Sequence, residues 1–309
     1  MISTVYRAQV DLLLQVLPHV ATEACFALKG GTAINLFVRD LPRLSVDIDL
    51  TYLPFHNRDQ ALAEITESLG RIKNRIEKAL PAVRVTPVQQ SDGQHAKLSC
   101  QSPSAQIKIE VNTTLRGTIA PGRLMQVSES VQEEFGKFAA INVVSHAELF
   151  GGKICAALDR QHPRDLFDIY YLLENEGLSD DLRLGFITCL ISSPRPINEM
   201  LNPRLQDQES AYQSQFAGMT MAPFSYEDYL STREKLIHEV SIWLSETDRQ
   251  FLISFKRGNP NWELVPLPTL MELPAVQWKL KNIQRLAEKD PTKHAQQLER
   301  LEAKLFRQG

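Results

Sequence analysis

The sequence predicts an α+β protein with a mixed sheet in its first part and helices in the remainder. Its 309 residues suggest about two domains at roughly 150 residues each. Helix-like and strand-like patterns alternate up to about residue 177, and strands become hard to find beyond it. Hydrophobic residues make up 43% and charged residues 23%, the range of globular proteins rather than disordered chains. We therefore predict a sheet domain over residues 1–177 and a helical C-terminal domain over residues 178–309.

The elements of the first part follow from two spacings. Apolar residues three or four positions apart predict helices, and apolar residues in alternation predict strands. In chain order the predicted elements are helix Val5–Val20, strand Cys25–Leu28, helix Thr32–Val38, strand Val46–Leu50, helix Arg58–Leu80, strands Val83–Val88, Ala96–Cys100, Gln106–Val111 and Ile141–Val144, and helices Ser145–Leu158 and Arg164–Leu173.

The second part is predicted to be helical, with proline-rich stretches as loops. The longest apolar stretch, near Phe186–Ile191, is too short to span a bilayer, and the N-terminus shows no secretory signal. We therefore expect a cytoplasmic protein whose four separated cysteines are free thiols. The predicted helices are Asp181–Ile191, Tyr226–Leu244, Thr247–Phe255, Gln277–Leu286 and a last one carrying Leu298, Leu301 and Leu305.

The charge balance excludes a uniformly basic nucleic-acid binder. Lysine and arginine number 34 against 37 acidic residues, a formal net charge of −3. The segment from Trp278 to Gly309, however, has eight basic and four acidic residues, including Lys279, Lys281 and Arg307. Either this is a solvated mixed-charge helix pair, or it is a basic wall that holds an RNA backbone.

The first candidate site combines a glycine turn with paired carboxylates. Lys29-Gly30-Gly31-Thr32 ends a predicted strand and begins a helix, where backbone N–H groups form a natural cradle for phosphate. Ser45-Val46-Asp47-Ile48-Asp49 follows, and its two carboxylates share one face of a strand. Such a pair suits Mg²⁺, which borrows further ligands from the phosphates of a nucleotide. Taken singly, a glycine pair is more often a tight turn and Asp-x-Asp more often a solvated edge.

A third acid, Glu110, would complete this site. The segment Ile107–Asn112 alternates, with Lys108, Glu110 and Asn112 on one face. If this strand lies beside Val46–Leu50, Glu110 reaches the metals held by the aspartates, and two Mg²⁺ ions then clamp an in-line displacement. The alternative is a solvent-facing polar surface.

Lys153 and the segment Arg164-Asp165-Leu166-Phe167-Asp168 form a second cluster. A lysine here could neutralise charge on a triphosphate, and Asp165 could orient it or the incoming base. The alternative is a set of ordinary surface salt bridges such as Arg164–Asp168. The Gly-Gly-Lys sequence at 151–153 is not a P-loop, because Ile154 replaces the required Ser or Thr.

At these residues the sequence resembles the nucleotidyltransferase superfamily, and more closely the AbiEii/AbiGii toxin family of bacterial toxin–antitoxin and phage-defence systems. The motifs named above carry the resemblance. It extends into the second half through Arg195-Pro196-Ile197, Phe216-Ala217-Gly218-Met219-Thr220, Gly258-Asn259-Pro260-Asn261-Trp262 and Gln277-Trp278-Lys279-Leu280-Lys281-Asn282.

The resemblance implies a nucleotidyltransferase-like core with a helical C-terminal domain. It implies Mg²⁺-dependent transfer of NMP from an NTP to RNA, in some members to the 3′ end of tRNA. It also implies a cognate antitoxin, which need not form a stable complex. The alternatives are a nucleotidyltransferase with a protein or small-molecule acceptor and a non-catalytic NTP-binding module.

The resemblance assigns roles to the residues of this sequence that match the family motifs position by position. The metal ligands would be Asp47 and Asp49, with Glu110 as the third acid, and the catalytic set adds Lys153 and Asp165, which fall in the later family motifs. The nucleotide-binding candidates are Lys29, Gly30, Gly31, Thr32, Ser45, Lys153, Arg164 and Asp168. This sequence departs from the family pattern in having Gly31 at the second position of the Gly-Ser signature, a longer gap to Asp47, and glutamate as the third acid.

Overall fold

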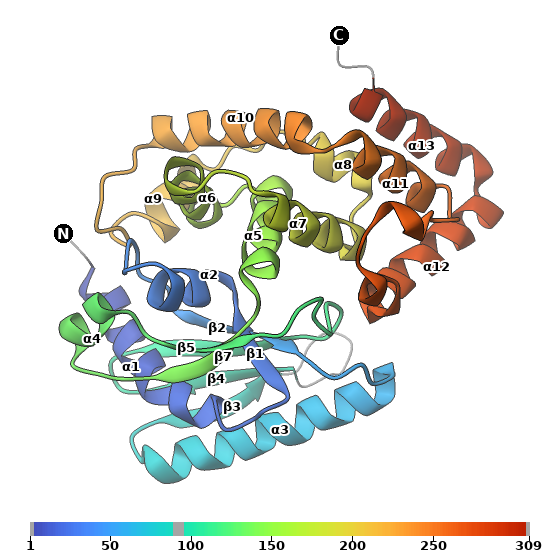
Figure 1. Cartoon of the computed structure of the whole chain (residues 1–309). Helices are drawn as coiled ribbons and strands as arrows, with labels where there is room; N and C mark the ends of the chain where they lie inside the picture. The colour runs from blue at the N-terminus through green and yellow to red at the C-terminus, as the bar shows by residue number, and fades with distance from the viewer. Residues whose placement is uncertain (1–2, 89–95, 307–309) are drawn as a thin grey trace. The chain divides into compact units, whose positions relative to one another are not determined.

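A computed structural model describes residues 3–88 and 96–306 (Figure 1). The chain forms two compact units. Unit 1 contains Met1–Ser145 and Phe216–Pro223, and unit 2 contains His146–Gln215 and Phe224–Gly309. The structure confirms the predicted α+β class, and each unit is described by itself. The domain boundary after residue 177 stays a prediction, because a compact unit and a functional domain need not end at the same residue.

Unit 1 is built on a mixed sheet, in which seven strands lie within the described residues. The strand order is β3-β4-β5-β2-β1-β7-β6. Strand β2 pairs with β5 in parallel, β1 pairs with β7 in parallel, and the remaining neighbours are antiparallel. The strands are β1 (Phe26–Lys29), β2 (Asp47–Tyr52), β3 (Arg84–Val88), β4 (Lys97–Gln101), β5 (Gln106–Asn112), β6 (Arg123–Gln126) and β7 (Ala140–Val143).

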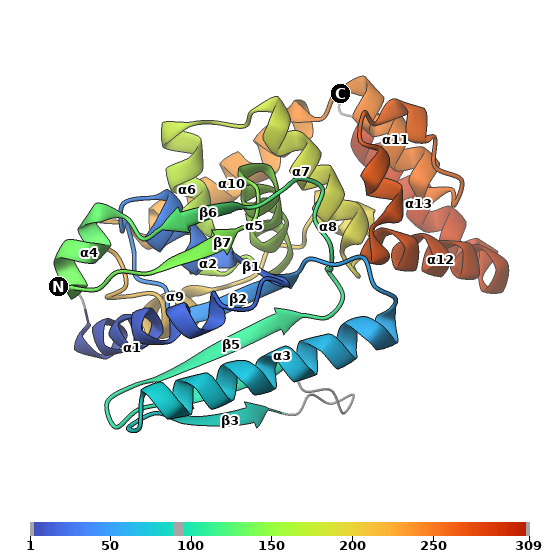
Figure 2. The same ribbon diagram turned by 60° about the horizontal axis from the view of Figure 1, so that its bottom comes forward.

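Helices α1 (Thr4–Val20) and α3 (Arg58–Ala79) cover the same face of this sheet (Figures 1 and 2). The cause is amphipathic patterning: α3 buries apolar side chains such as Ile65 and Ile72, and β5 buries Ile107, Ile109 and Val111 beneath the helices. Asp47 and Asp49 alternate with fully buried residues on β2, so they are turned to the opposite face.

The chain passes from β1 directly into α2 (Gly30–Ala33), which continues as a π-helical turn, η1 (Ile34–Val38). The predicted helix is therefore present, but it starts two residues earlier. Gly30 has φ +74°, a conformation that glycine adopts without strain and that lets the helix begin at once after the strand. The return segment Phe216–Pro223 also belongs to unit 1: Leu44 N donates to Met219 O over 2.7 Å.

The described residues of unit 2 form helices joined by loops. Its N-terminal helix α5 crosses α7 very closely, and α10 and α11 begin with serine–aspartate capping boxes. The helices are α5 (His146–Arg160), α6 (Pro163–Asn175), α7 (Asp180–Ser192), α8 (Ile197–Leu201), α9 (Glu209–Gln215), α10 (Tyr226–Trp243), α11 (Glu246–Lys256), η2 (Trp262–Leu264), η3 (Pro268–Glu272), α12 (Pro274–Lys289) and α13 (Pro291–Phe306).

The predicted elements are present, with ends that shift by a few residues. Strand β6 and the short helices α4 (Glu129–Phe135), α8 and α9 were not predicted. These pieces are too short to show a full period of apolar residues. In the described part of the chain, no helix has both the length and the apolar character to cross a membrane.

Candidate functional site

A row of charged side chains crosses four neighbouring strands on one face of the sheet in unit 1. Lys29 on β1 lies opposite Asp49 on β2, Asp49 lies beside Glu110 on β5, and Glu110 lies opposite Lys97 on β4. Partners in neighbouring strands point to the same face, so the two acids are adjacent and a lysine flanks each side. The condition set for Glu110 is therefore met, because its strand lies beside the Asp-x-Asp strand.

The glycine turn packs directly against this row. A Cβ atom placed on Gly30 would lie 2.5 Å from Oδ2 of Asp49, so only a residue without a side chain allows the carboxylate this close to the backbone. A Cβ atom on Gly31 would lie 2.8 Å from Nη2 of Arg43 and 2.9 Å from Oγ of Ser45. The two glycines thus bring the start of α2 next to an acid, a cation and a hydroxyl.

The Thr32 side chain joins the helix to the acidic strand. It is fully buried, its hydroxyl hydrogen-bonds the Ser45 hydroxyl over 3.0 Å, and it donates to the backbone carbonyl of Asp47. These contacts fix the position of the first aspartate relative to the glycine turn. The geometry therefore gives Thr32 and Ser45 a positioning role beside the nucleotide-binding role predicted for them.

Arg43 also lies at this site, although it was not among the predicted site residues. Its side chain is 2% exposed, its Nη1 donates to Leu44 O over 2.9 Å, and its backbone pairs with Thr220 of the return segment. A buried guanidinium beside a glycine turn is a ready partner for phosphate. No local pattern marks it, because the return segment that covers it is far away in the sequence.

The acidic pair has the donor chemistry of a Mg²⁺ site. Asp47 and Asp49 are half-buried, two residues apart on one strand, and supply only oxygen ligands. Mg²⁺ takes one or two carboxylates and completes its shell with water and phosphate, so this pair fits the ion. Lys97 Nζ contacts Glu110 Oε1 at 2.8 Å, and the described residues contain no group of three or more His, Cys, Asp or Glu side chains arranged around a metal. Glu110 as third ligand stays a prediction.

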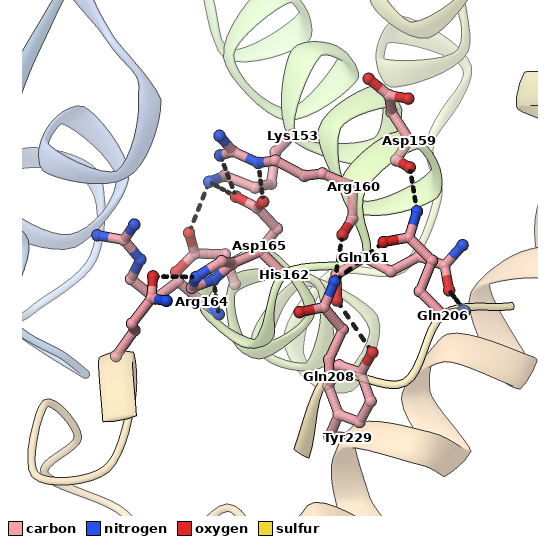
Figure 3. Close-up of polar contacts among 12 residues, drawn as sticks. Lys153, Asp159, Arg160, Gln161, His162, Arg164, Asp165, Gln206, Gln208 and Tyr229 are labelled. Carbon is pink, nitrogen blue, oxygen red and sulfur yellow. Dashed lines mark hydrogen bonds and ion pairs between the residues drawn. The ribbon is translucent and has the colours of Figure 1, made fainter. Parts of the chain in front are cut away.

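The second predicted cluster lies in unit 2, between α5 and α6. Lys153 Nζ contacts Asp165 Oδ1 at 2.7 Å and Asp168 Oδ2 at 3.0 Å, and all three side chains are at most 5% exposed. Arg160 adds a second contact, from Nη2 to Asp165 Oδ1 at 3.0 Å (Figure 3). This buried network is unlike the surface salt bridges that were the alternative.

Opposing effects act on the Asp165 carboxyl. Burial disfavours its charged form, but the charges of Lys153 and Arg160 outweigh burial and hold its pKa well below the ordinary value. Arg164, the remaining predicted residue, follows the start of α6, where its backbone N–H donates to His162 Nδ1 over 3.2 Å. Burial lowers the pKa of this histidine, which favours the neutral, accepting form.

The turn between these helices is fixed by a polar network that sequence reasoning missed. Gln161 is 1% exposed and has φ 49°. Its carbonyl accepts from Tyr229 Oη at 2.9 Å, and its Oε1 accepts from Gln206 N at 3.0 Å (Figure 3). Gln208 Nε2 donates to the Arg160 carbonyl over 3.0 Å. The network holds Arg160 in position on Asp165.

Comparison with known proteins decides the family. The family described as "Nucleotidyl transferase AbiEii toxin, Type IV TA system" matches residues 11–282. The chain belongs to this AbiEii family. It is therefore a nucleotidyltransferase toxin of a type IV toxin–antitoxin system, and the family implies a cognate antitoxin.

A solved structure agrees with this assignment at the level of fold. MenT4, a nucleotidyltransferase toxin from Mycobacterium tuberculosis H37Rv, superposes with a TM-score of 0.55 at 16% sequence identity. The match covers 97% of this chain and 93% of MenT4. A search of curated proteins gave no match. The AbiEii motifs identified in the sequence thus lie on a known nucleotidyltransferase fold.

Proposed function

We propose that this AbiEii chain transfers NMP from an NTP to the 3′-hydroxyl of an RNA, with the acceptor end of tRNA as the substrate. The adjacent carboxylates of Asp49 and Glu110, with Asp47 on the same strand face, are the observation that carries the proposal. An acidic group of this kind beside a glycine turn suits chemistry on a triphosphate.

The two aspartates, Asp47 and Asp49, would hold Mg²⁺, with Glu110 as a third ligand. When bound, this ion would offset the negative charge of the triphosphate and lower the pKa of the attacking hydroxyl.

The residues of the chain would each have a defined task. Gly30 and Gly31 bring backbone N–H groups up to the phosphates, and Arg43 and Lys29 offset their charge. The RNA 3′-oxygen bonds to the α-phosphorus, the bond from this phosphorus to the bridging oxygen of the leaving group breaks, and pyrophosphate departs. The Asp49 or Glu110 carboxylate takes the proton of the hydroxyl.

Lys153 and Asp165 remain catalytic candidates on the strength of the family motifs, and Arg164 and Asp168 remain nucleotide-binding candidates. Their support is the resemblance together with the positioning of Lys153 Nζ by Asp165 Oδ1 at 2.7 Å. Because the same contact stabilises unit 2, activity losses in variants of this cluster count only when folding is intact.

The deciding assay incubates the chain with each labelled NTP, Mg²⁺ and total tRNA. We expect one NTP to label tRNA, and Asp47→Asn to lower the rate by roughly 10²–10³-fold at unchanged stability, because a neutral amide holds Mg²⁺ at the phosphates more weakly than a carboxylate does. Asp59→Asn, an exposed carboxylate in the first turn of α3, is the matched control and keeps the full rate.

Three outcomes contradict the proposal. If Asp47→Asn still labels tRNA at the full rate, the acidic pair is not part of the active site. Label found in protein or a small molecule of a whole-cell extract, and not in RNA, replaces the acceptor. Tight Mg²⁺-dependent NTP binding without turnover on any acceptor identifies a binding module.

A further inference from the structure

Helix α12 carries an exposed basic and aromatic row, which we call the α12 stripe: Trp278, Lys281, Arg285 and Lys289. These positions are three or four residues apart, so they lie along one face of the helix. All four side chains are exposed, and Trp278 keeps 55% of its surface open to solvent. The stripe contains no acidic residue.

The opposite face of α12 fixes this orientation. Val276 and Ile283 are buried, and the buried Lys279 donates from Nζ to Leu190 O over 2.9 Å and to Arg195 O over 2.7 Å. Lys279 therefore anchors the helix and does not belong to the basic surface, which corrects its place in the charge count of the sequence. Arg307, also counted there, lies outside the described residues.

The cations of the stripe are not used within the described structure. None of Lys281, Arg285 and Lys289 forms an ion pair with a described residue, whereas Arg257 nearby in the same unit pairs with Glu302 at 2.9 Å. Their charges are thus available to a ligand. A row of exposed cations without acidic partners attracts a polyanion such as a nucleic-acid backbone.

Trp278 differs from the other two tryptophans in its surroundings. Trp243 stacks on Phe186 with ring centroids 5.8 Å apart, and Trp262 packs on Phe251 at 5.7 Å. No described aromatic ring contacts Trp278. An indole that is 55% exposed at one end of a row of cations resembles the aromatic stacking platforms of proteins that bind single strands.

We propose that the α12 stripe is a binding site for single-stranded RNA, with a base stacked on Trp278 and successive phosphates on Lys281, Arg285 and Lys289. The three cations are about 6 Å apart along the helix axis, comparable with the distance between neighbouring phosphates of an extended strand. This inference rests on the proposed RNA acceptor and assigns that acceptor a contact surface.

A lipid surface fits the stripe less well. Helices that lie on membranes present a broad apolar face, whereas Trp278 is the single apolar member of this one. An acidic protein would satisfy the cations but leaves the open indole unexplained. Both partners are therefore treated as outcomes that would overturn the proposal.

The test measures binding of a fluorescently labelled, unstructured 12-nucleotide RNA to the full chain at several salt concentrations. The triple variant Lys281→Gln/Arg285→Gln/Lys289→Gln is expected to bind about tenfold or more weakly at low salt. Its slope of log affinity against log salt should be smaller by about 2, because single strands contribute about 0.7 per phosphate contact. Arg58→Gln/Lys78→Gln/Arg204→Gln removes the same charge from exposed positions elsewhere and should match the unmodified chain.

Trp278 gives an independent signal. Trp278→Ala should weaken binding by roughly 5- to 100-fold, and Trp278→Phe should retain most of the affinity because a ring remains for stacking. RNA should quench tryptophan fluorescence in the unmodified chain and fail to do so in Trp278→Phe. Thermal unfolding should be unchanged in all these variants, since the side chains are exposed.

The outcomes separate this inference from the proposed function. Equal affinity and equal salt slope in the two triple variants overturn the stripe, whatever the transfer assay shows. The proposal is also overturned if the triple variant of the α12 stripe loses binding to phosphatidylserine vesicles, or to an acidic protein, but keeps its affinity for RNA. RNA binding through the stripe without any RNA labelling supports the stripe and overturns the RNA acceptor.

Discussion

At the scale of single residues, Lys153 has the clearest structural consequence. It is the cation between two carboxylates, Asp165 and Asp168, which are themselves at most 1% exposed. Lys153→Met keeps the apolar stem but removes the charge, leaving both carboxylates buried with less compensation. We expect the free energy of unfolding to fall by about 3–5 kcal/mol, measured by urea denaturation followed by circular dichroism.

A surface pair supplies the comparison for Lys153. Lys235 contacts Glu174 at 3.1 Å, and about half of each side chain is exposed. Lys235→Met should cost less than about 1 kcal/mol because water screens this pair. Similar losses in the two variants would show that the buried network does not stabilise unit 2. Asp47→Asn, which is expected to lose activity but not stability, completes the contrast between the two clusters.

At the scale of elements, the crossing of α5 and α7 depends on two glycines. A Cβ atom on Gly185 would clash with the backbone carbonyl of Ala147, and one on Gly151 would clash with the backbone of Gly185. Backbone atoms cannot move aside as side chains do, so Gly185→Ala must separate the helices. We expect a loss of about 3 kcal/mol in the free energy of unfolding.

Gly152→Ala is the matched control for this crossing. Gly152 lies on α5 beside Gly151 and faces α7, but its Cβ would meet only Cys189 Sγ at 4.0 Å, an ordinary contact. Alanine also favours a helix interior by about 1 kcal/mol over glycine, so this variant should be as stable as the natural chain or more so. A Gly185→Ala chain as stable as Gly152→Ala would mean that the helices do not cross this closely.

Much of the acidic site could be predicted because it depends on local patterns. The alternation of apolar and polar residues on β2 and β5 predicted that Asp47, Asp49 and Glu110 lie on the sheet face away from the buried apolar residues. Because the two strands are neighbours, Asp49 and Glu110 then lie side by side. The glycine pair predicted a tight turn after the strand because glycine tolerates positive φ, and Gly30 has φ +74°.

What could not be predicted depends on contacts between distant segments. The return segment Phe216–Pro223 contacts Arg43 although more than half of the chain separates them in sequence, and no local pattern of residues predicts this contact. Lys279 was counted with the other basic residues of the C-terminal segment because charge composition does not show which cations are buried. Its two carbonyl partners come from the end of α7 and the loop that follows it. Strand β6 lacks buried residues, so alternation could not reveal it.

At the scale of the whole molecule, groups with shifted pKa values decide how stability depends on pH. Burial lowers the pKa of Lys279 to about 7 and that of Lys256 to about 8, since both ammonium groups are largely removed from water. Burial raises the pKa of the Cys100 thiol to about 12. As pH rises, the two lysine shifts increase the free energy of unfolding, and the Cys100 shift decreases it.

The signs of these shifts place the most stable pH well above the isoelectric point of about 6.2. Between pH 7 and 10.5 the unfolded chain keeps protons that folded Lys279 and Lys256 have lost, so stability rises with pH. Above pH 9 the unfolded chain loses a thiol proton that folded Cys100 keeps, which opposes this rise, but the two lysines outweigh the single thiol until the unfolded lysines also lose their protons. We expect stability to rise up to about pH 10 in urea unfolding under reducing conditions. Lys279→Met should reduce the rise of stability with pH, and Lys235→Met should leave that rise unchanged. A maximum near pH 6 would contradict the lowered pKa values of Lys279 and Lys256.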